Sequence, residues 1–168
     1  MPHPLDLGPI ETARLVLAPL RPEQAKALRA VTSDPAVTAV IPFLPEPFGL
    51  QQARALIARH DGGRDLFLGL WRRHDGELLG ALGVHLRGAA ELEIGYWLPA
   101  RHHGRGYASE AAAAAALAYA EAFPRRRLIA ECRPDNAASR RVLAKAGFAA
   151  TGAAGERDGR ELFVRSGT

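Results

Sequence analysis

The sequence contains a single cysteine, Cys132, among its 168 residues. One cysteine cannot form a disulfide within the chain, so a disulfide-stapled scaffold is excluded and nothing indicates an oxidising compartment. No apolar run approaches the ~20 residues that a membrane-spanning helix needs. Residues 1–9 also lack the basic region and apolar core of a secretion signal. We therefore expect a cytoplasmic protein with no membrane attachment.

Lysine and aromatic residues are scarce. Only Lys26 and Lys145 are lysines among 22 basic residues, aromatics make up 7% of the chain, and the longest basic run is residues 125–127. A nucleic-acid-binding face usually combines clustered cations with stacking aromatics, so no direct nucleic-acid binding is expected. The six histidines show no i, i+4 pair beside a third ligand, and no metal site is predicted.

The length and the hydrophobic fraction of 48% fit one compact domain spanning residues 1–168. Apolar alternation predicts strands at 15–19, 66–71, 78–86, 92–98, 128–132, 148–154 and 161–164. Helical periodicity predicts helices at 22–31, 51–60, 108–122 and 137–146. The helix between strands 92–98 and 128–132 should make those two strands parallel, while short turns make the other pairs antiparallel. The predicted class is α+β.

Gly104 and Gly106 stand between a predicted strand and a predicted helix. Glycine allows positive φ and close backbone approach, and a helix N-terminus offers unpaired N–H groups, so this turn is a candidate phosphate cradle. A dinucleotide fingerprint would need a third glycine where Ser109 stands. A nucleotide P-loop would need lysine and then Ser or Thr where Tyr107 and Ala108 stand. A tight turn without a ligand is the remaining alternative.

A longer motif surrounds these glycines. It reads Arg101-x-x-Gly104-x-Gly106-Tyr107-Ala108-x-Glu110-Ala111, behind Ile94-Gly95-Tyr96-Trp97-Leu98, with Asn136-x-x-Ser139-x-x-Val142-Leu143 and Gly147-Phe148 downstream. Together with the opening Glu11-Thr12-x-Arg14-Leu15-x-Leu17-x-Pro19-Leu20, this pattern resembles the GNAT superfamily of acetyl-CoA-dependent N-acetyltransferases. Within that superfamily it is most similar to the group that includes the ribosomal-protein alanine N-acetyltransferases. The resemblance implies a mostly antiparallel twisted sheet of about seven strands, flanked by about four helices.

The resemblance also implies acetyl-CoA as acetyl donor, no metal, and a primary amine as acceptor, either a protein N-terminus or a small molecule. In this family the strand ending at Leu98 bulges away from the strand ending at Cys132, and the pantetheine arm fills the gap. The residues then expected to bind the cofactor are Trp97, Leu98, Arg101, His102, His103, Gly104, Arg105, Gly106, Tyr107, Ala108, Ser109, Asn136 and Ser139. A monomer or homodimer is expected. A non-catalytic acyl-CoA sensor and an RNA- or ribosome-associated basic protein remain alternatives.

Glu93 and Ser139 are the candidates for catalysis. A hairpin loop at residues 87–89 would place Glu93 opposite Gly83, where a ligand has room, and Glu93 could then act as base; the alternative is a half-exposed strand carboxylate paired with an arginine. Ser139 shares a helical stripe with Val142, Leu143 and Ala146 and should face inward. It could hydrogen-bond the departing thiolate, or be an ordinary residue of the first helical turn.

Two further features leave alternatives open. The four prolines of residues 33–48 exclude a continuous helix and indicate a shaped loop. Its apolar side chains either line the acceptor site, as the family implies, or anchor the loop in a small core; they are Ile41, Phe43, Leu44 and Phe48. Cys132 alternates with Leu128 and Ala130, which favours an inert core thiol over an acyl nucleophile.

Overall fold

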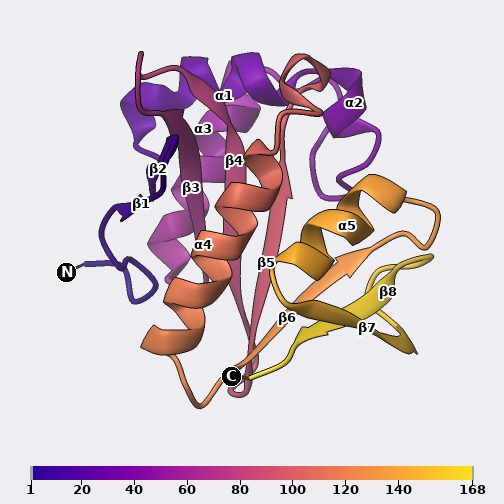
Figure 1. Cartoon of the computed structure of the whole chain (residues 1–168). Helices are drawn as coiled ribbons and strands as arrows, with labels where there is room; N and C mark the ends of the chain where they lie inside the picture. The colour runs from indigo at the N-terminus through magenta and orange to yellow at the C-terminus, as the bar shows by residue number, and fades with distance from the viewer. Residues whose placement is uncertain (1, 168) are drawn as a thin grey trace.

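A computed structural model describes residues 2–167 of the chain (Figure 1). Over this range eight strands form a mixed sheet in the order β1-β2-β3-β4-β5-β6-β8-β7. The strands are β1 Ile10–Glu11, β2 Leu15–Pro19, β3 Asp65–Arg72, β4 Leu78–Arg87, β5 Glu91–Trp97, β6 Arg127–Cys132, β7 Phe148–Ala154 and β8 Glu161–Arg165. Neighbours pair antiparallel except β5 and β6, which are parallel. The predicted α+β class and the predicted parallel unit are confirmed.

The α-helices are α1 Ala25–Thr32, α2 Pro35–Thr38, α3 Leu50–Ala58, α4 Tyr107–Ala122 and α5 Ala137–Lys145, with 3-10 turns η1 Pro22–Gln24, η2 Arg59–Gly62 and η3 Ala100–His102. The expected counts of about seven strands and four helices are each one too low. β1 has two residues, too few for alternation to show. α2 has four residues and starts at Pro35, where the Asp34 side chain accepts a hydrogen bond from the Ala36 N–H. A proline-rich segment can hold such a single turn because proline fits the first helical position.

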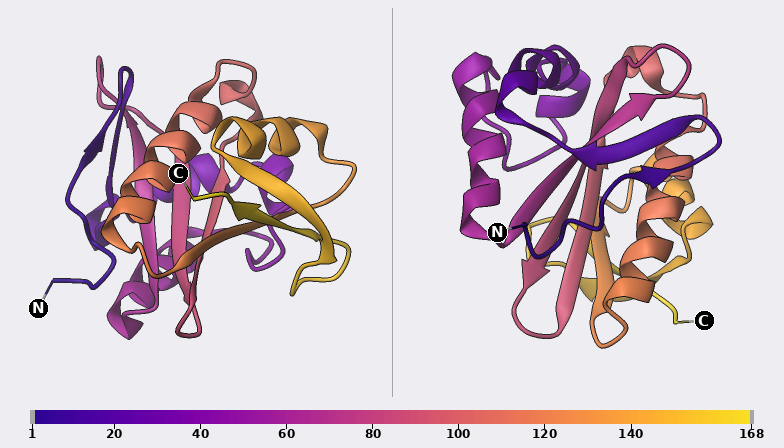
Figure 2. Two further views of the ribbon diagram at one scale, coloured as in Figure 1. Left: turned by 60° about the horizontal axis from the view of Figure 1, so that its bottom comes forward. Right: turned by 90° about the vertical axis from the view of Figure 1, so that its left-hand side faces the viewer.

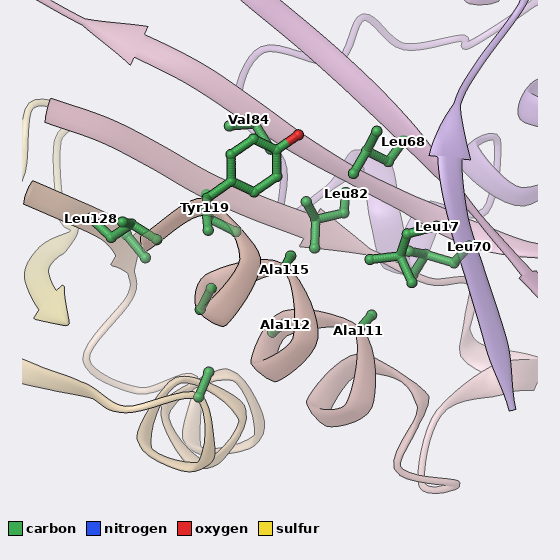
Figure 3. Close-up of a cluster of buried hydrophobic side chains, with 14 of the residues drawn as sticks. Leu17, Leu68, Leu70, Leu82, Val84, Ala111, Ala112, Ala115, Tyr119 and Leu128 are labelled. Atoms are coloured by element: carbon green, nitrogen blue, oxygen red, sulfur yellow. The ribbon is translucent and has the colours of Figure 1, made fainter. Parts of the chain in front are cut away.

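Helices cover both faces of the sheet. In the right-hand view of Figure 2, α1 and α3 lie on one side of the strands, and α4 and α5 lie on the other. The core under α4 includes Leu17, Leu66, Leu68, Leu70, Leu82, Val84, Leu92 and Ile94, and the core under α1 and α3 includes Leu28, Val31, Leu56, Ile57, Phe67 and Trp97. Figure 3 shows the alanines of α4 facing the leucines of the sheet. Their small side chains let the helix lie close to the strands without voids.

The sheet opens between β5 and β6. These strands pair over three positions only, Glu91 with Arg127, Leu92 with Leu128, and Glu93 with Ile129. β5 continues to Trp97, whereas β6 continues to Cys132 beside β8. The backbone of β5 after Glu93 therefore has no strand partner on this edge, which leaves polar groups free for a ligand.

The register of the β4–β5 hairpin corrects the prediction for Glu93. Its Cα partner is His85, while Gly83 pairs with Gly95. The loop consists of residues 88–90, because Arg87 and Glu91 form the last pair. This register differs from the predicted one by two residues on the partner strand, and a shift of two leaves every side chain on its original face. Apolar patterning could not distinguish the two registers.

The N-terminal segment is anchored in the core of the α4 side. Leu5 is fully buried, and the hydroxyl of Tyr119 on α4 donates a hydrogen bond of 2.8 Å to the Leu5 carbonyl. Among residues 2–167 no helix is long and apolar enough to cross a membrane.

Candidate functional site

A cavity of about 630 Å³ follows the opening between β5 and β6. Residues 94–98 of β5 and 130–132 of β6 line it, together with the turn before α4, the inner face of α5 and part of residues 36–43. A volume of this size falls in the range of roughly 300–1,000 Å³ usual for sites of cofactors and small ligands. The break in strand pairing and this cavity therefore coincide.

The turn before α4 has the geometry of an anion site. Gly104 and Gly106 have φ values of 72° and 80°, in the left-handed region that favours glycine. The first hydrogen bond of α4 runs from the Glu110 N–H to the Gly106 carbonyl at 3.0 Å, which leaves the N–H groups of the first three helical residues without intrahelical acceptors. A Cβ placed on Gly104 would meet nothing within 4 Å. This open turn can receive a phosphate close to the backbone.

Residues near the N-terminus hold this turn in place. Thr12 donates through Oγ1 to Glu110 Oε1 at 2.6 Å, and Arg14 donates through Nε to Glu110 Oε2 at 2.7 Å. The Arg14 guanidinium also donates to the Arg105 carbonyl at 3.0 Å and lies 4.4 Å from the centre of the Tyr107 ring. Burial raises the pKa of Glu110, but the hydrogen bonds from Thr12 and Arg14 outweigh burial and keep that pKa below its ordinary value. The sequence did not predict these contacts, because they join residues 98 and 96 positions apart in the chain.

All of the predicted cofactor-binding residues except Arg101 and Arg105 line the cavity. His103 uses its ring, with Nε2 donating to the Leu98 carbonyl at 2.7 Å, so it ties the turn to the end of β5. Trp97 lies on the α1 side of the sheet, where its indole donates to Thr32 at 3.0 Å. Two cationic residues of α5 that were not predicted also line the cavity, Arg141 and Lys145.

Ser139 faces the cavity as predicted and contacts a tyrosine. Its Oγ lies 2.9 Å from the hydroxyl oxygen of Tyr96 on β5. Asn136 accepts a hydrogen bond of 3.1 Å from the Ser139 N–H, so the predicted helix cap also positions the serine. Burial raises the pKa of Tyr96 to about 12, which keeps the phenol protonated at neutral pH. Tyr96 was not among the predicted catalytic or cofactor-binding residues; its alternation with Leu92 and Ile94 was the available signal.

Cys132 is buried, with 2% of its surface exposed, and it lies at the end of β6 beside the cavity. Burial raises the pKa of its thiol. The predicted buried thiol is confirmed, and the raised pKa does not favour a nucleophilic thiolate.

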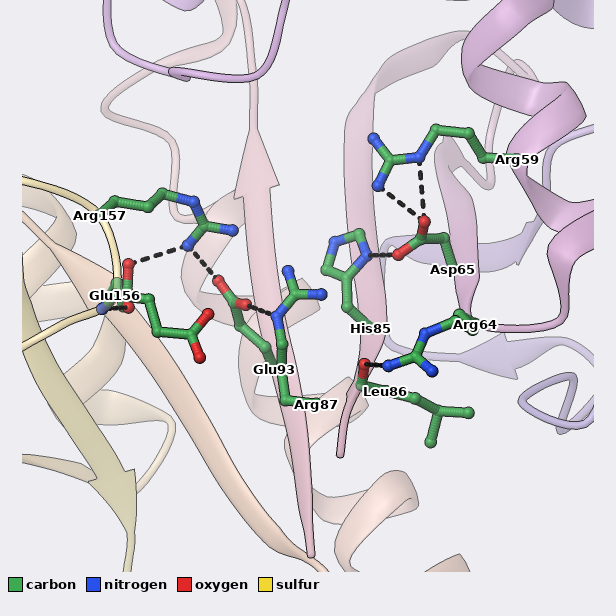
Figure 4. A network of polar contacts seen from close by, with 10 residues as sticks. Arg59, Arg64, Asp65, His85, Leu86, Arg87, Glu93, Glu156 and Arg157 are labelled. Atoms are coloured by element: carbon green, nitrogen blue, oxygen red, sulfur yellow. Dashed lines mark hydrogen bonds and ion pairs between the residues drawn. The ribbon is translucent and has the colours of Figure 1, made fainter. Parts of the chain in front are cut away.

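Glu93 points to the opposite face of the sheet from Tyr96 and lies between two arginines. Its carboxylate pairs with Arg87 Nε and Arg157 Nη1, each at 2.5 Å (Figure 4). Arg157 also pairs with Glu131 at 2.9 Å. Burial raises the pKa of Glu93, but Arg157 and Arg87 outweigh burial and the pKa lies below its ordinary value. The expected pairing with an arginine is present, but the side chain is buried rather than half-exposed, with 6% of its surface accessible. Glu93 also lines the cavity, and its role as base stays a prediction.

The apolar residues of the 33–48 segment divide between the two roles considered for them. Ile41 and Phe43 line the cavity, whereas Leu44 and Phe48 are buried in the core under α1 and α3. The same face of the cavity carries Arg160, whose guanidinium donates to the Val40 carbonyl. This face is therefore partly apolar and partly cationic.

Comparisons with known proteins agree with this arrangement. The family model described as "Acetyltransferase (GNAT) domain" matches residues 14–149. The uncharacterized N-acetyltransferase YoaA of Bacillus subtilis is 32% identical over 145 residues, covering 83% of this chain and 81% of that protein. An acetyltransferase (GNAT family) structure from Bacillus anthracis superimposes with a TM-score of 0.80 at 25% identity, covering 94% of this chain and 97% of that chain. RimL, a ribosomal L7/L12 alpha-N-protein acetyltransferase solved with coenzyme A, has the same fold, with a TM-score of 0.78 at 22% identity over 94% of this chain and 97% of that chain.

Proposed function

Because the chain belongs to the GNAT family of acetyltransferases, we propose that it transfers an acetyl group from acetyl-CoA to a primary amine. The observation that carries this proposal is the continuity of the cavity. It joins an anion cradle, an opening in the sheet, a protonated hydroxyl pair and a separate face for a second substrate. A sensor that only bound an acyl-CoA would need no such second face.

The donor fits the residues that are present. The first-turn N–H groups of α4 and the room at Gly104 suit a pyrophosphate, and the cations Arg141 and Lys145 suit further phosphate charge. The unpaired edge of β5 after Glu93 offers backbone hydrogen bonds to an extended pantetheine arm. Bound acetyl-CoA supplies an activated acetyl group as a thioester.

The two faces of the sheet serve different reactants. Tyr96 and Ser139, on the α4 and α5 side, offer protonated hydroxyls to the sulfur that leaves. The amine approaches from the face that carries Phe43 and Trp97. Holding the two reactants in line can supply up to about 7–11 kcal/mol of the barrier reduction, so direct attack needs no covalent enzyme intermediate. Glu93 and its two arginines set the charge of this second face, on which the amine approaches.

A protein N-terminus is the first acceptor to test. RimL is described as an alpha-N-protein acetyltransferase, and its fold is shared. An α-amino group also has a pKa near ~7.7–8.0, compared with ~10.4 for lysine, so a larger fraction is neutral and reactive at pH 7. Small-molecule amines are the second group of acceptors.

Mass spectrometry of an acceptor panel incubated with acetyl-CoA tests the proposal. The panel should contain peptides with free N-termini, the same peptides with blocked N-termini, polyamines and amino acids. We expect a mass increase of one acetyl group on at least one free amine, and none on the blocked peptides. Cofactor binding without transfer to any amine would favour the sensor, and RNA binding that weakens steeply with salt would favour the RNA-associated alternative.

A further inference from the structure

His85 on β4 forms an oriented dyad with Asp65 on β3. The imidazole is buried, with 3% of its surface exposed, and Nδ1 lies 2.6 Å from Asp65 Oδ1. Arg59 holds the other carboxylate oxygen through Nε at 3.0 Å and Nη2 at 2.7 Å (Figure 4). Burial raises the pKa of Asp65, but the hydrogen bonds from His85 and Arg59 outweigh it and keep that pKa below its ordinary value. The ionised carboxylate can only accept, so Nδ1 donates, and in the neutral imidazole the lone pair therefore lies on Nε2.

The free Nε2 lies over a floor without side chains. A Cβ placed on Gly83 would come within 2.4 Å of His85 Nε2, so the ring edge covers Gly83. Gly83 pairs with Gly95 on β5, and a Cβ on Gly95 would meet nothing within 4 Å. The free nitrogen therefore lies against Gly83, whose partner Gly95 belongs to the part of β5 that has already separated from β6.

This position is on the amine side of the cavity. Paired residues on antiparallel strands share a face of the sheet. His85, Gly95 and Trp97 are therefore all on the face opposite Tyr96. His85 and Gly95 both line the cavity, and the rings of Phe43 and Phe67 flank the imidazole at centroid distances of 6.3 and 5.3 Å. Within the part of the chain that the structure describes, Nε2 has no hydrogen-bond partner, in contrast to Glu93, whose two oxygens are both taken by arginines.

We propose that His85 is the general base that deprotonates the acceptor amine, with Asp65 as its positioning residue. This inference rests on the proposed acetyl transfer. His85 Nε2 takes one proton from the ammonium group, and the neutral amine forms a C–N bond to the thioester carbonyl carbon. The C–S bond then breaks with its electron pair on sulfur. Tyr96 and Ser139 together donate one proton to the thiolate. The pair is reprotonated by the second proton, which the acceptor nitrogen loses as the amide forms. His85 returns its proton to water, so the products are the amide, free coenzyme A and one proton.

Several titratable or charged groups lie on the elements packed around the imidazole and enter any pH dependence. They are Asp65 on β3, Arg59 and His60 on η2, Glu93 on β5, Arg87 at the end of β4 and Arg157 in the β7–β8 loop. Variants of His85 should therefore be compared with a Glu93 variant in the same assay.

The test is the pH profile of kcat/KM for wild type and His85→Gln, using acetyl-CoA and the best acceptor from the panel. General bases contribute roughly 10²–10⁴-fold, so we expect a loss of about 100-fold at pH 6.5. The loss should shrink as the pH rises, because a deprotonated amine needs no base, and the affinity for acetyl-CoA should stay unchanged. The matched control is His74→Gln, because His74 lies on the exposed β3–β4 turn with 72% of its side chain accessible. It should leave the profile unaltered.

Two variants probe the dyad without removing the imidazole. In Asp65→Asn the amide can donate to Nδ1, which forces the proton onto Nε2 and removes the acceptor from the cavity. Gly83→Ala pushes the ring away from its place because of the 2.4 Å approach. Both should reproduce the low-pH loss of His85→Gln, and Asp65→Glu, which keeps a carboxylate to accept from Nδ1, should recover part of the rate. These variants also decide the matter if His85→Gln fails to fold.

The outcomes separate this inference from the proposed function. If wild type acetylates an amine but His85→Gln keeps the wild-type rate and pH profile, His85 is structural and the inference is overturned. If instead the acid limb of the profile survives in His85→Gln and disappears in Glu93→Gln, the base is Glu93. If wild type transfers no acetyl group to any amine, the proposed function itself is wrong.

Discussion

The hydrogen-bonded pair of Tyr96 and Ser139 gives the sharpest test of leaving-group stabilisation. Tyr96→Phe removes a phenol whose oxygen lies 2.9 Å from Ser139 Oγ, and Ser139→Ala removes the other partner. A hydrogen bond to a charged group contributes about 1.5–3 kcal/mol. One factor of ten in rate corresponds to about 1.4 kcal/mol, so either variant should slow the chemical step by roughly 10–150-fold. The hydrogen bond strengthens only as charge develops on sulfur, so acetyl-CoA affinity should hardly change.

The two variants should not be additive. Since each hydroxyl depends on the other for its orientation, removal of one already disables the pair, and the double variant should lose little more than the worse single variant. The assay is single-turnover transfer from a preformed complex with acetyl-CoA, well below the melting temperature of each variant. A wild-type single-turnover rate in both single variants would refute the leaving-group role. Fully additive losses would refute the idea that the hydroxyls act as one unit.

Tyr119→Phe is the matched control for the tyrosine. Its hydroxyl also donates a buried hydrogen bond, to the Leu5 carbonyl at 2.8 Å, but Tyr119 does not line the cavity. Loss of that bond leaves a buried acceptor unpaired and should cost about 1–3 kcal/mol of stability. For a domain of this size each kcal/mol lowers Tm by roughly 2–4 °C. The single-turnover rate should stay at the wild-type value.

Three other predictions concern binding and stability. Gly106→Val should abolish the rise in Tm that acetyl-CoA gives wild type, because the residue has φ of 80° and a β-branched side chain is strained there; NADH and ATP should give little shift in either protein. Glu93→Gln should lower Tm at pH 7, since breaking a buried ion pair with Arg157 costs about 3–5 kcal/mol. Glu110→Ala should raise the Kd for acetyl-CoA in calorimetry by about 10-fold, because Arg14 loses the carboxylate that fixes the turn, worth about 1.4 kcal/mol.

The sign of the Glu93 effect with pH follows from its pKa. The folded state lowers that pKa from the ordinary value of 4.5, so the stabilisation is fully present above pH 4.5 and is lost as the pH falls through the lower folded value. The difference in Tm between wild type and Glu93→Gln should therefore shrink below pH 4.5. A constant difference across this range would mean that the carboxylate charge does not stabilise the fold.

An unchanged thermal shift in Gly106→Val, or an unchanged Kd in Glu110→Ala, would contradict the proposal that the turn before α4 binds phosphate.

Local patterns in the sequence were enough to predict the main strands and helices and the glycine turn before α4. Alternation and helical periodicity are set by neighbours in the chain, so the strands from β2 to β8 and the helices α1, α3, α4 and α5 follow from apolar spacing. The Gly104 to Gly106 turn, the Asn136 cap and the inward direction of Ser139 are also local properties. These features could be predicted because each depends on residues a few positions apart.

Only the tertiary structure decided which side chains meet. The hairpin register moved the partner of Glu93 from Gly83 to His85, since a shift of two residues preserves every face and no pattern can detect it. The contact of Tyr96 with Ser139 and the dyad of Asp65 with His85 join residues 43 and 20 positions apart, through strand order and helix packing. Local preference carries no information about such distances. The glycine turn before α4 could therefore be predicted from the sequence, whereas the residues proposed to transfer the proton could be identified only from the fold.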